Sequence, residues 1–221
     1  MTKQVLRDDV VREARAKELT YFNDRGVWRK RPRQEAYQRT GRAPITVRWV
    51  DINKGDSSNP ENRSRLVAKE IKRDVRNDLF AATPPLEAKK ALFSFAVTEG
   101  IGWKGDRRSG MKVDFIDVRR AYFFAKAKRE VYVDLIGEDH EPGMCGRLNK
   151  SMYGTRDAAQ NWEEEYTSFL VGIGFRRGKA SPCVFFNKER NIRVVVHGDD
   201  FTMLGWNYQL DWFWKEIQKK F

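Results

Sequence analysis

The fold and a candidate site are both indicated by one stretch of sequence, Val194-Val195-Val196-His197-Gly198-Asp199-Asp200-Phe201. The three valines are β-branched and predict a buried strand, and Gly198 permits a tight turn. Residues 201–204 are apolar enough to return as the partner strand. Such a hairpin places two adjacent carboxylates at its tip, where like charges repel unless a cation neutralises them. We therefore expect a divalent-metal site, for which the rest of the chain must supply a third ligand.

The composition is that of a folded protein with a strongly basic first half. The chain has 221 residues, of which 40% are hydrophobic and 13% aromatic, enough to build the core of a substantial domain. Residues 1–130 carry a net charge of 31 − 18 = +13, and residues 131–221 carry 12 − 13 = −1, for a total of +12. We interpret this asymmetry as a polyanion-binding face, with a solvated basic surface as the alternative.

Cysteine usage and the lengths of the apolar runs favour a reducing, aqueous compartment. Cys145 and Cys183 have neither the spacing of a disulfide framework nor that of a zinc site. The N-terminus lacks the apolar core of a signal peptide, and the apolar runs are far too short to span a bilayer. We expect an intracellular protein of the cytoplasm or nucleus without a membrane partner. The sequence does not specify an oligomeric state.

Apolar periodicity predicts helices mixed with antiparallel strands, and so an α+β class. The expected helices cover residues 3–22, a segment that starts after Pro84-Pro85, residues 156–171 and residues 208–221. The expected strands cover residues 45–52, 63–71, 111–118, 131–135, 183–186 and 192–197. Apart from the first of these strands, we expect residues 23–62 to be irregular, because Gly and Pro recur there.

A third carboxylate is available at the end of the predicted strand 111–118. Asp117 ends an apolar strand as Asp199 does, so the two can lie side by side on neighbouring strands. Three carboxylates suit a pair of Mg²⁺ ions, which prefer oxygen ligands. Two such ions would activate a 3′-hydroxyl and stabilise a leaving pyrophosphate in an in-line displacement. The alternatives are an exposed strand end for Asp117 and an ordinary polar turn for Asp199-Asp200.

Short motifs follow one another along the chain from about residue 25. They are Trp28 and Pro32, then Arg48-Trp49-Val50, Arg63-Ser64-Arg65-Leu66-Val67-Ala68-Lys69, Asp117-Val118-Arg119-Arg120-Ala121-Tyr122, Glu130-Val131-Tyr132-Val133, Cys145-Gly146-Arg147-Leu148-Asn149-Lys150-Ser151-Met152-Tyr153-Gly154, Trp162, Gly174-Phe175 and Gly198-Asp199-Asp200. Each match alone is weak, Gly-Asp-Asp included. In order and spacing together, they resemble the reverse transcriptase domain of copia-type retrotransposon Pol polyproteins.

The resemblance implies the palm and fingers of a right-handed polymerase, with an antiparallel palm sheet backed by helices. On this basis residues 1–24 form an N-terminal helical segment, residues 25–110 are mostly fingers, and residues 111–221 are mostly palm. The family's thumb would follow the catalytic hairpin. We expect the chain to be truncated there, with the thumb missing, and the isolated chain to be weak or inactive.

The implied activity is that of an RNA-directed DNA polymerase, which uses an RNA or DNA template with a primer, dNTPs and two Mg²⁺ ions, with Mn²⁺ as the alternative ion. By resemblance, Asp117 and Asp199 are the principal metal ligands, assisted by the Val118 carbonyl. Asp200 is then the second member of the polymerase dyad.

Other positions carry implied contacts to nucleotide and template. Tyr122 matches the aromatic residue that blocks a ribose 2′-hydroxyl, and Tyr153-Gly154 match the segment under the incoming nucleotide and template. Arg63, Arg65 and Lys69 lie on the finger strand that meets the triphosphate. The alternatives are simple core packing for Tyr122 and a solvated surface for the three basic residues.

The chain also departs from the family pattern. After Gly154, Thr155-Arg156-Asp157-Ala158-Ala159-Gln160 stands where the family usually has Leu-Lys-Gln-Ala-Pro-Arg. A carboxylate at position 157 would repel a template phosphate. The aromatic residue that usually opens the catalytic turn is His197 here, with Gly198 in place of an apolar residue.

Two other functions stay open from the sequence. One is a catalytically dead nucleic-acid-binding remnant of the element, which would keep the basic face without turnover. The other is an RNA-dependent RNA polymerase, since those enzymes also use Gly-Asp-Asp. Tyr122 argues against the second, because an RNA polymerase would need a polar residue there to accept the 2′-hydroxyl.

Overall fold

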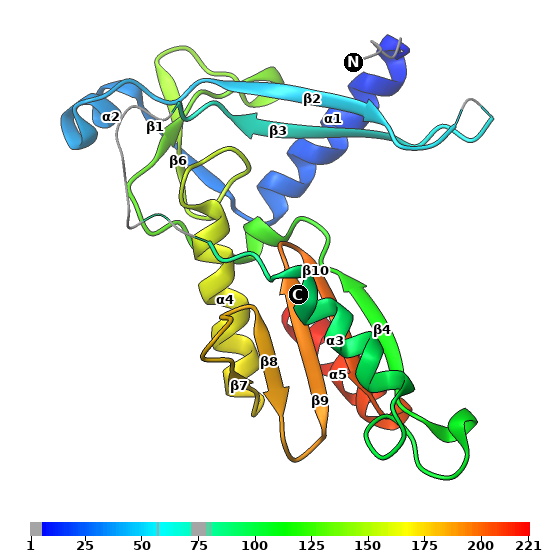
Figure 1. The fold of residues 1–221 in the computed structure, drawn as a ribbon. Helices are drawn as coiled ribbons and strands as arrows, with labels where there is room; N and C mark the ends of the chain where they lie inside the picture. The colour runs from blue at the N-terminus through cyan, green and yellow to red at the C-terminus, as the bar shows by residue number, and fades with distance from the viewer. Residues whose placement is uncertain (1–5, 57, 72–78, 80) are drawn as a thin grey trace. The chain divides into compact units, whose positions relative to one another are not determined.

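The computed structural model describes residues 6–56, 58–71, 79 and 81–221 (Figure 1). The chain forms two compact units, and each unit combines two segments of the sequence. Unit 1 consists of Met1–Leu79 and Ala125–Asn161, and unit 2 consists of Phe80–Phe124 and Trp162–Phe221. None of the described helices is long and apolar enough to cross a membrane.

Unit 2 is built on a five-stranded antiparallel sheet of order β4-β10-β9-β8-β7 (Figure 1). Its strands are β4 (Lys112–Asp117), β7 (Arg176–Arg177), β8 (Val184–Asn187), β9 (Ile192–His197) and β10 (Asp200–Gly205). Its helices are α3 (Leu86–Val97), the greater part of α4 (Ala158–Gly172), α5 (Asn207–Lys220) and the short 3₁₀ turns η1 (Arg107–Ser109) and η2 (Ala121–Phe124). This sheet and its helices confirm the predicted α+β class.

Helices cover both faces of this sheet. On one face, Leu92 of α3 packs in a buried cluster with Met111, Val195 and Leu204. On the other face, α4 and α5 supply aromatic rings. Trp162 and Tyr166 of α4 make edge contacts with Phe201, and the Trp214 indole N–H of α5 donates to Asp114 at 2.8 Å. The sheet is therefore the middle layer of three.

Unit 1 holds two smaller sheets. One has the order β1-β6-β5, and the other is the antiparallel pair β2-β3. The elements are α1 (Asp8–Asp24), β1 (Trp28–Pro32), α2 (Arg33–Thr40), β2 (Val47–Asn53), β3 (Asn62–Ala68), β5 (Tyr132–Val133), the 3₁₀ turn η3 (Gly137–Asp139) and β6 (Met144–Leu148). The hairpin β2-β3 is tied to α1, because Asp51 accepts a hydrogen bond from Arg15 at 2.6 Å. Within the hairpin, Asp51 also accepts a hydrogen bond from Ser64 at 2.7 Å.

One part of the structure differs from the sequence-based expectation. Residues 23–62 are not irregular outside β2, since β1 and α2 form there. Trp28 is the buried member of β1, so the strand lacks the alternation that would have predicted it. In the structure, α3 packs on the sheet of unit 2, and β6 pairs with β1 in unit 1. The assignment of residues 25–110 to fingers and residues 111–221 to palm stays a prediction.

Candidate active site

The predicted hairpin forms between β9 and β10. His197 pairs with Asp200 across the ladder, which leaves Gly198 and Asp199 as the two turn residues. Gly198 has a φ of +66°, a conformation that costs other residues strain and that hairpin turns of this length require at a central position. The turn therefore exposes Asp200 and holds Asp199 half-buried at the tip.

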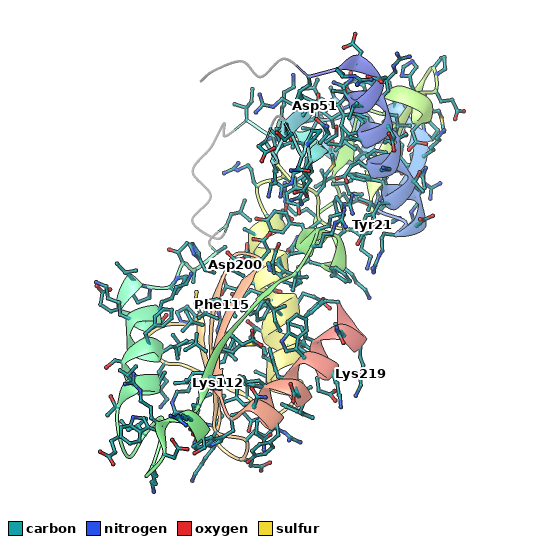
Figure 2. The ribbon with its side chains drawn as sticks, turned by 90° about the vertical axis from the view of Figure 1, so that its right-hand side faces the viewer. Tyr21, Asp51, Lys112, Phe115, Asp200 and Lys219 are labelled. Carbon is teal, nitrogen blue, oxygen red and sulfur yellow. The ribbon has the colours of Figure 1, made fainter. Side chains whose placement is uncertain are left out.

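Strand pairing places the third carboxylate, that of Asp117, next to the turn. β4 lies beside β10, and Asp117 is the direct partner of Asp200. The Val118 N–H donates to the Asp199 carbonyl oxygen at 3.0 Å and continues the ladder past the end of β4. One carboxylate oxygen from each of Asp117, Asp199 and Asp200 lies within 4.8 Å of the others. Figure 2 shows Asp200 at this end of the sheet, with Phe115 and Lys112 farther along β4.

A buried tryptophan holds the turn between β9 and β10 by a hydrogen bond. The Trp162 indole N–H donates to the Gly198 carbonyl oxygen at 2.8 Å, and its side chain is 1% exposed. The ring also makes edge contacts with Tyr166 and Phe221. Trp162 belongs to the motifs found in the sequence, but no local signal ties it to the turn.

The donor set of the tip fits a hard divalent cation. All three groups are carboxylates, which Mg²⁺ favours, and two of them are exposed to incoming ligands. Without a cation, three negative charges within this distance repel one another. A cationic side chain also lies beside the cluster, since Lys89 of α3 approaches His197 Nδ1 at 3.5 Å.

Tyr122 lies in η2, five positions after Asp117. It is half-buried, whereas its neighbours Ala121 and Phe123 are 2% and 1% exposed. Phe123 therefore fills the core position of this turn. The role of Tyr122 as a deoxyribose gate stays a prediction.

In unit 1, the structure brings three of the expected nucleotide-contacting residues together. The Arg65 guanidinium lies over the Tyr153 ring at 5.4 Å, and the Ala68 N–H donates to the Tyr153 carbonyl oxygen at 2.8 Å. Gly154 has a φ of +84°, and a Cβ there would collide with the Ala68 carbonyl oxygen. The segment Tyr153-Gly154 thus packs directly on the end of β3.

The other two basic residues flank this contact. Buried Ser64 and Leu66 face α1, so the alternation of β3 turns Arg63 and Arg65 to the opposite face. Lys69 follows the strand and donates its backbone N–H to the Thr46 carbonyl oxygen at 2.8 Å.

The expected repulsion at Asp157 is wrong, because its carboxylate is buried and already paired. Asp157 is 4% exposed and accepts hydrogen bonds from Arg129 at 2.6 Å and from the Asn161 amide at 3.1 Å. Burial alone would raise the pKa of Asp157, but the hydrogen bonds and charge of Arg129 outweigh it and hold this pKa below its usual value. The carboxylate belongs to an internal ion network rather than to a template-facing surface.

Three carboxylates at one end of an antiparallel sheet define a candidate metal-dependent phosphoryl-transfer site. Residues 37–221 match the model of the family described as reverse transcriptase (RNA-dependent DNA polymerase). The chain belongs to this family, which confirms the resemblance to copia-type reverse transcriptase domains.

Known proteins similar to the chain are retrotransposon polyproteins. It is 26% identical over 179 residues to the retrovirus-related Pol polyprotein from transposon TNT 1-94 of Nicotiana tabacum, and 25% identical over 169 residues to that from transposon RE2 of Arabidopsis thaliana. These alignments cover 75% and 73% of the chain but 12% and 11% of the polyproteins. A shorter alignment, 30% identical over 99 residues, covers 42% of the chain and 6% of the transposon Ty1-DR4 Gag-Pol polyprotein of Saccharomyces cerevisiae.

Proposed function

We propose that the chain carries the polymerase centre of a retrotransposon reverse transcriptase and adds dNTPs to a primer 3′-hydroxyl on an RNA or DNA template. The observation that carries this proposal is the convergence of Asp117, Asp199 and Asp200 within 4.8 Å in a member of the reverse transcriptase family. Unit 2, with its antiparallel sheet, is the proposed palm, and the β2-β3 hairpin of unit 1 belongs to the proposed fingers. An enzyme of this kind works inside the cell.

The three carboxylates are the proposed ligands of two Mg²⁺ ions, with the Val118 carbonyl assisting. Bound Mg²⁺ supplies the positive charge that activates the primer hydroxyl and stabilises the leaving pyrophosphate. The protein contributes positioning. The ladder holds Asp117 opposite Asp200, and Trp162 holds the turn that carries Asp199. A site held in this way needs little rearrangement when charge develops during the reaction.

Unit 1 is the proposed source of contacts to phosphate and base. Arg63, Arg65 and Lys69 provide cations for the triphosphate, as the resemblance implies, and Tyr153-Gly154 provide the surface under the nucleotide and template. The packing of Arg65 on Tyr153 supports a shared role for these two residues.

Tyr122 is the proposed selector against ribonucleotides, which separates this function from that of an RNA polymerase. Tyr122→Ala should raise the ratio of ribonucleotide to deoxyribonucleotide incorporation, measured as kcat/KM for each nucleotide. An unchanged ratio would remove the gate from the proposal.

Primer extension tests the activity directly. The protein, with an RNA template, a DNA primer, dNTPs and Mg²⁺, should extend the primer weakly as the isolated chain and more strongly within a longer Pol polyprotein, and Asp199→Asn should abolish extension in both. Asp211→Asn is the matched control, because Asp211 is an exposed residue of α5 outside the carboxylate cluster. Equal extension by the wild type and Asp199→Asn would refute the proposed centre. Salt-dependent RNA binding without any extension would identify a non-catalytic binding remnant instead.

A further inference from the structure

Arg129 lies between two acidic side chains of unit 1. Its two terminal nitrogens each donate to an oxygen of Glu70 at 3.0 Å, and one of them also donates to Asp157 at 2.6 Å. The side chains of Arg129, Glu70 and Asp157 are 28%, 14% and 6% exposed. This fork of parallel hydrogen bonds uses the planar geometry of guanidinium, which the ammonium of lysine lacks.

The two acids tie Arg129 to the end of β3 and to the residues that directly follow Tyr153-Gly154. Glu70 follows β3 and accepts the backbone N–H of Arg156 at 2.7 Å. Asp157 also accepts from the Asn161 amide at 3.1 Å, at the start of α4. Tyr153-Gly154 itself packs on the end of β3, through the bond from the Ala68 N–H to Tyr153 and through the contact at Gly154.

The same residues border a cleft in unit 1. A cavity of about 650 Å³ is lined by Lys69, Glu70, Arg129 and Arg156, together with the loop before β2. Lys69 is one of the proposed triphosphate-contacting residues, so Glu70 and Arg129 line the same cavity as a cation proposed to bind the triphosphate.

Charge balance makes Arg129 the critical member of the network. With Arg129 present, one cation faces two carboxylates. Without it, two largely buried carboxylates lose the cation that pairs with both of them, which is strongly destabilising. The segment can relieve this destabilisation by moving away from β3, which would displace Tyr153-Gly154.

We propose that Arg129 is a positioning residue that acts through Glu70 and Asp157 to hold Tyr153-Gly154 against the end of β3 for nucleotide binding. The carboxylate at position 157, where the family usually has an amide, closes this network. The inference rests on the proposed function of unit 1.

Steady-state kinetics test the consequence for substrate. Arg129→Gln should raise the KM for dNTP by at least about tenfold with a smaller change in kcat, because a misplaced binding segment weakens substrate binding. Adding Asp157→Asn removes one uncompensated charge and should restore a large part of this loss. Arg147→Gln is the matched control. Arg147 is also an ion-paired arginine of unit 1. It lies 2.8 Å from Glu130, and 29% of the Arg147 side chain is exposed.

Hydrogen exchange tests the positioning independently of activity. In Arg129→Gln, the amides of Ala68 and Arg156 should exchange at least about tenfold faster. The reason is that the Ala68 N–H donates to Tyr153 and the Arg156 N–H donates to Glu70. The amide of Val196 in unit 2, which donates to Cys183, should exchange at the wild-type rate. Arg147→Gln should leave the exchange of Ala68 and Arg156 unchanged.

The outcomes separate the inference from the proposed function. Unchanged exchange at Ala68 and Arg156 in Arg129→Gln, or the same KM in Arg129→Gln and Arg147→Gln, would overturn the positioning role. Failure of the wild type to extend a primer, both as this chain and within a longer Pol polyprotein, would refute the proposed function, while the exchange measurement would still decide whether Arg129 holds the segment.

Discussion

Removing one carboxylate from the cluster of Asp117, Asp199 and Asp200 should stabilise the metal-free protein and abolish its response to Mg²⁺. The three carboxylate oxygens lie within 4.8 Å of one another. Two unit charges 4.8 Å apart repel by about 0.9 kcal/mol in water, and salt at about 0.15 M lowers this to roughly 0.5 kcal/mol. Asp117 has two such neighbours, so Asp117→Asn should raise the free energy of unfolding by about 1 kcal/mol.

The measurement is urea unfolding followed by tryptophan fluorescence, in EDTA and in Mg²⁺. At an Mg²⁺ concentration about ten times the Kd, the free energy of unfolding of the wild-type protein should rise by about 1.4 kcal/mol, and that of Asp117→Asn should rise much less. Asp114→Asn is the control, since Asp114 lies on β4 but bonds to Trp214 on the opposite face. Asp114→Asn should show no increase in the free energy of unfolding in EDTA, and it should keep the stabilisation by Mg²⁺. A loss of stability for Asp117→Asn in EDTA, or a preserved Mg²⁺ response, would refute the reasoning.

Three further predictions concern the supports of the two candidate sites. Gly154→Ala should destabilise the protein by about 3 kcal/mol, through backbone strain and the collision with Ala68. Gly26→Ala, at a φ of +57° with open space around it, should lose only about 1 kcal/mol in the same denaturation assay. Similar losses for the two would contradict the close approach of Ala68 to Gly154. Trp162→Phe removes the donor to the Gly198 carbonyl oxygen and should lose about 1–2 kcal/mol and weaken Mg²⁺ binding by calorimetry; an unchanged affinity would show that the turn does not need this anchor. Finally, the lowered pKa of Asp157 means that its pairing stabilises the fold fully above about pH 5 and less as the pH falls below about 4. Asp157→Asn should therefore flatten the acid limb of the unfolding free energy, and an unchanged limb would count against the pairing.

Local physics made much of unit 2 predictable. The valine run of β9, the glycine turn and the apolar return strand lie next to one another in the chain, so β-propensity and turn chemistry were enough to predict the hairpin. The start of α3 after Pro85 follows from the fixed φ of proline. By contrast, β1 was not predicted, because it is a polar edge strand that depends on pairing with β6.

The candidate sites divide in the same way. The sequence alone determined which residue types could hold a metal ion, and it predicted that Asp117 and Asp199 end apolar strands. The pairing of Asp117 with Asp200 is visible in the folded sheet alone, because strand order and register are set by packing on both faces of the whole sheet. Likewise, Arg129 lies 59 positions from Glu70 and 28 from Asp157, and no local pattern connects them. A buried charge requires a partner of opposite charge, and folding is what brings that partner into contact with it.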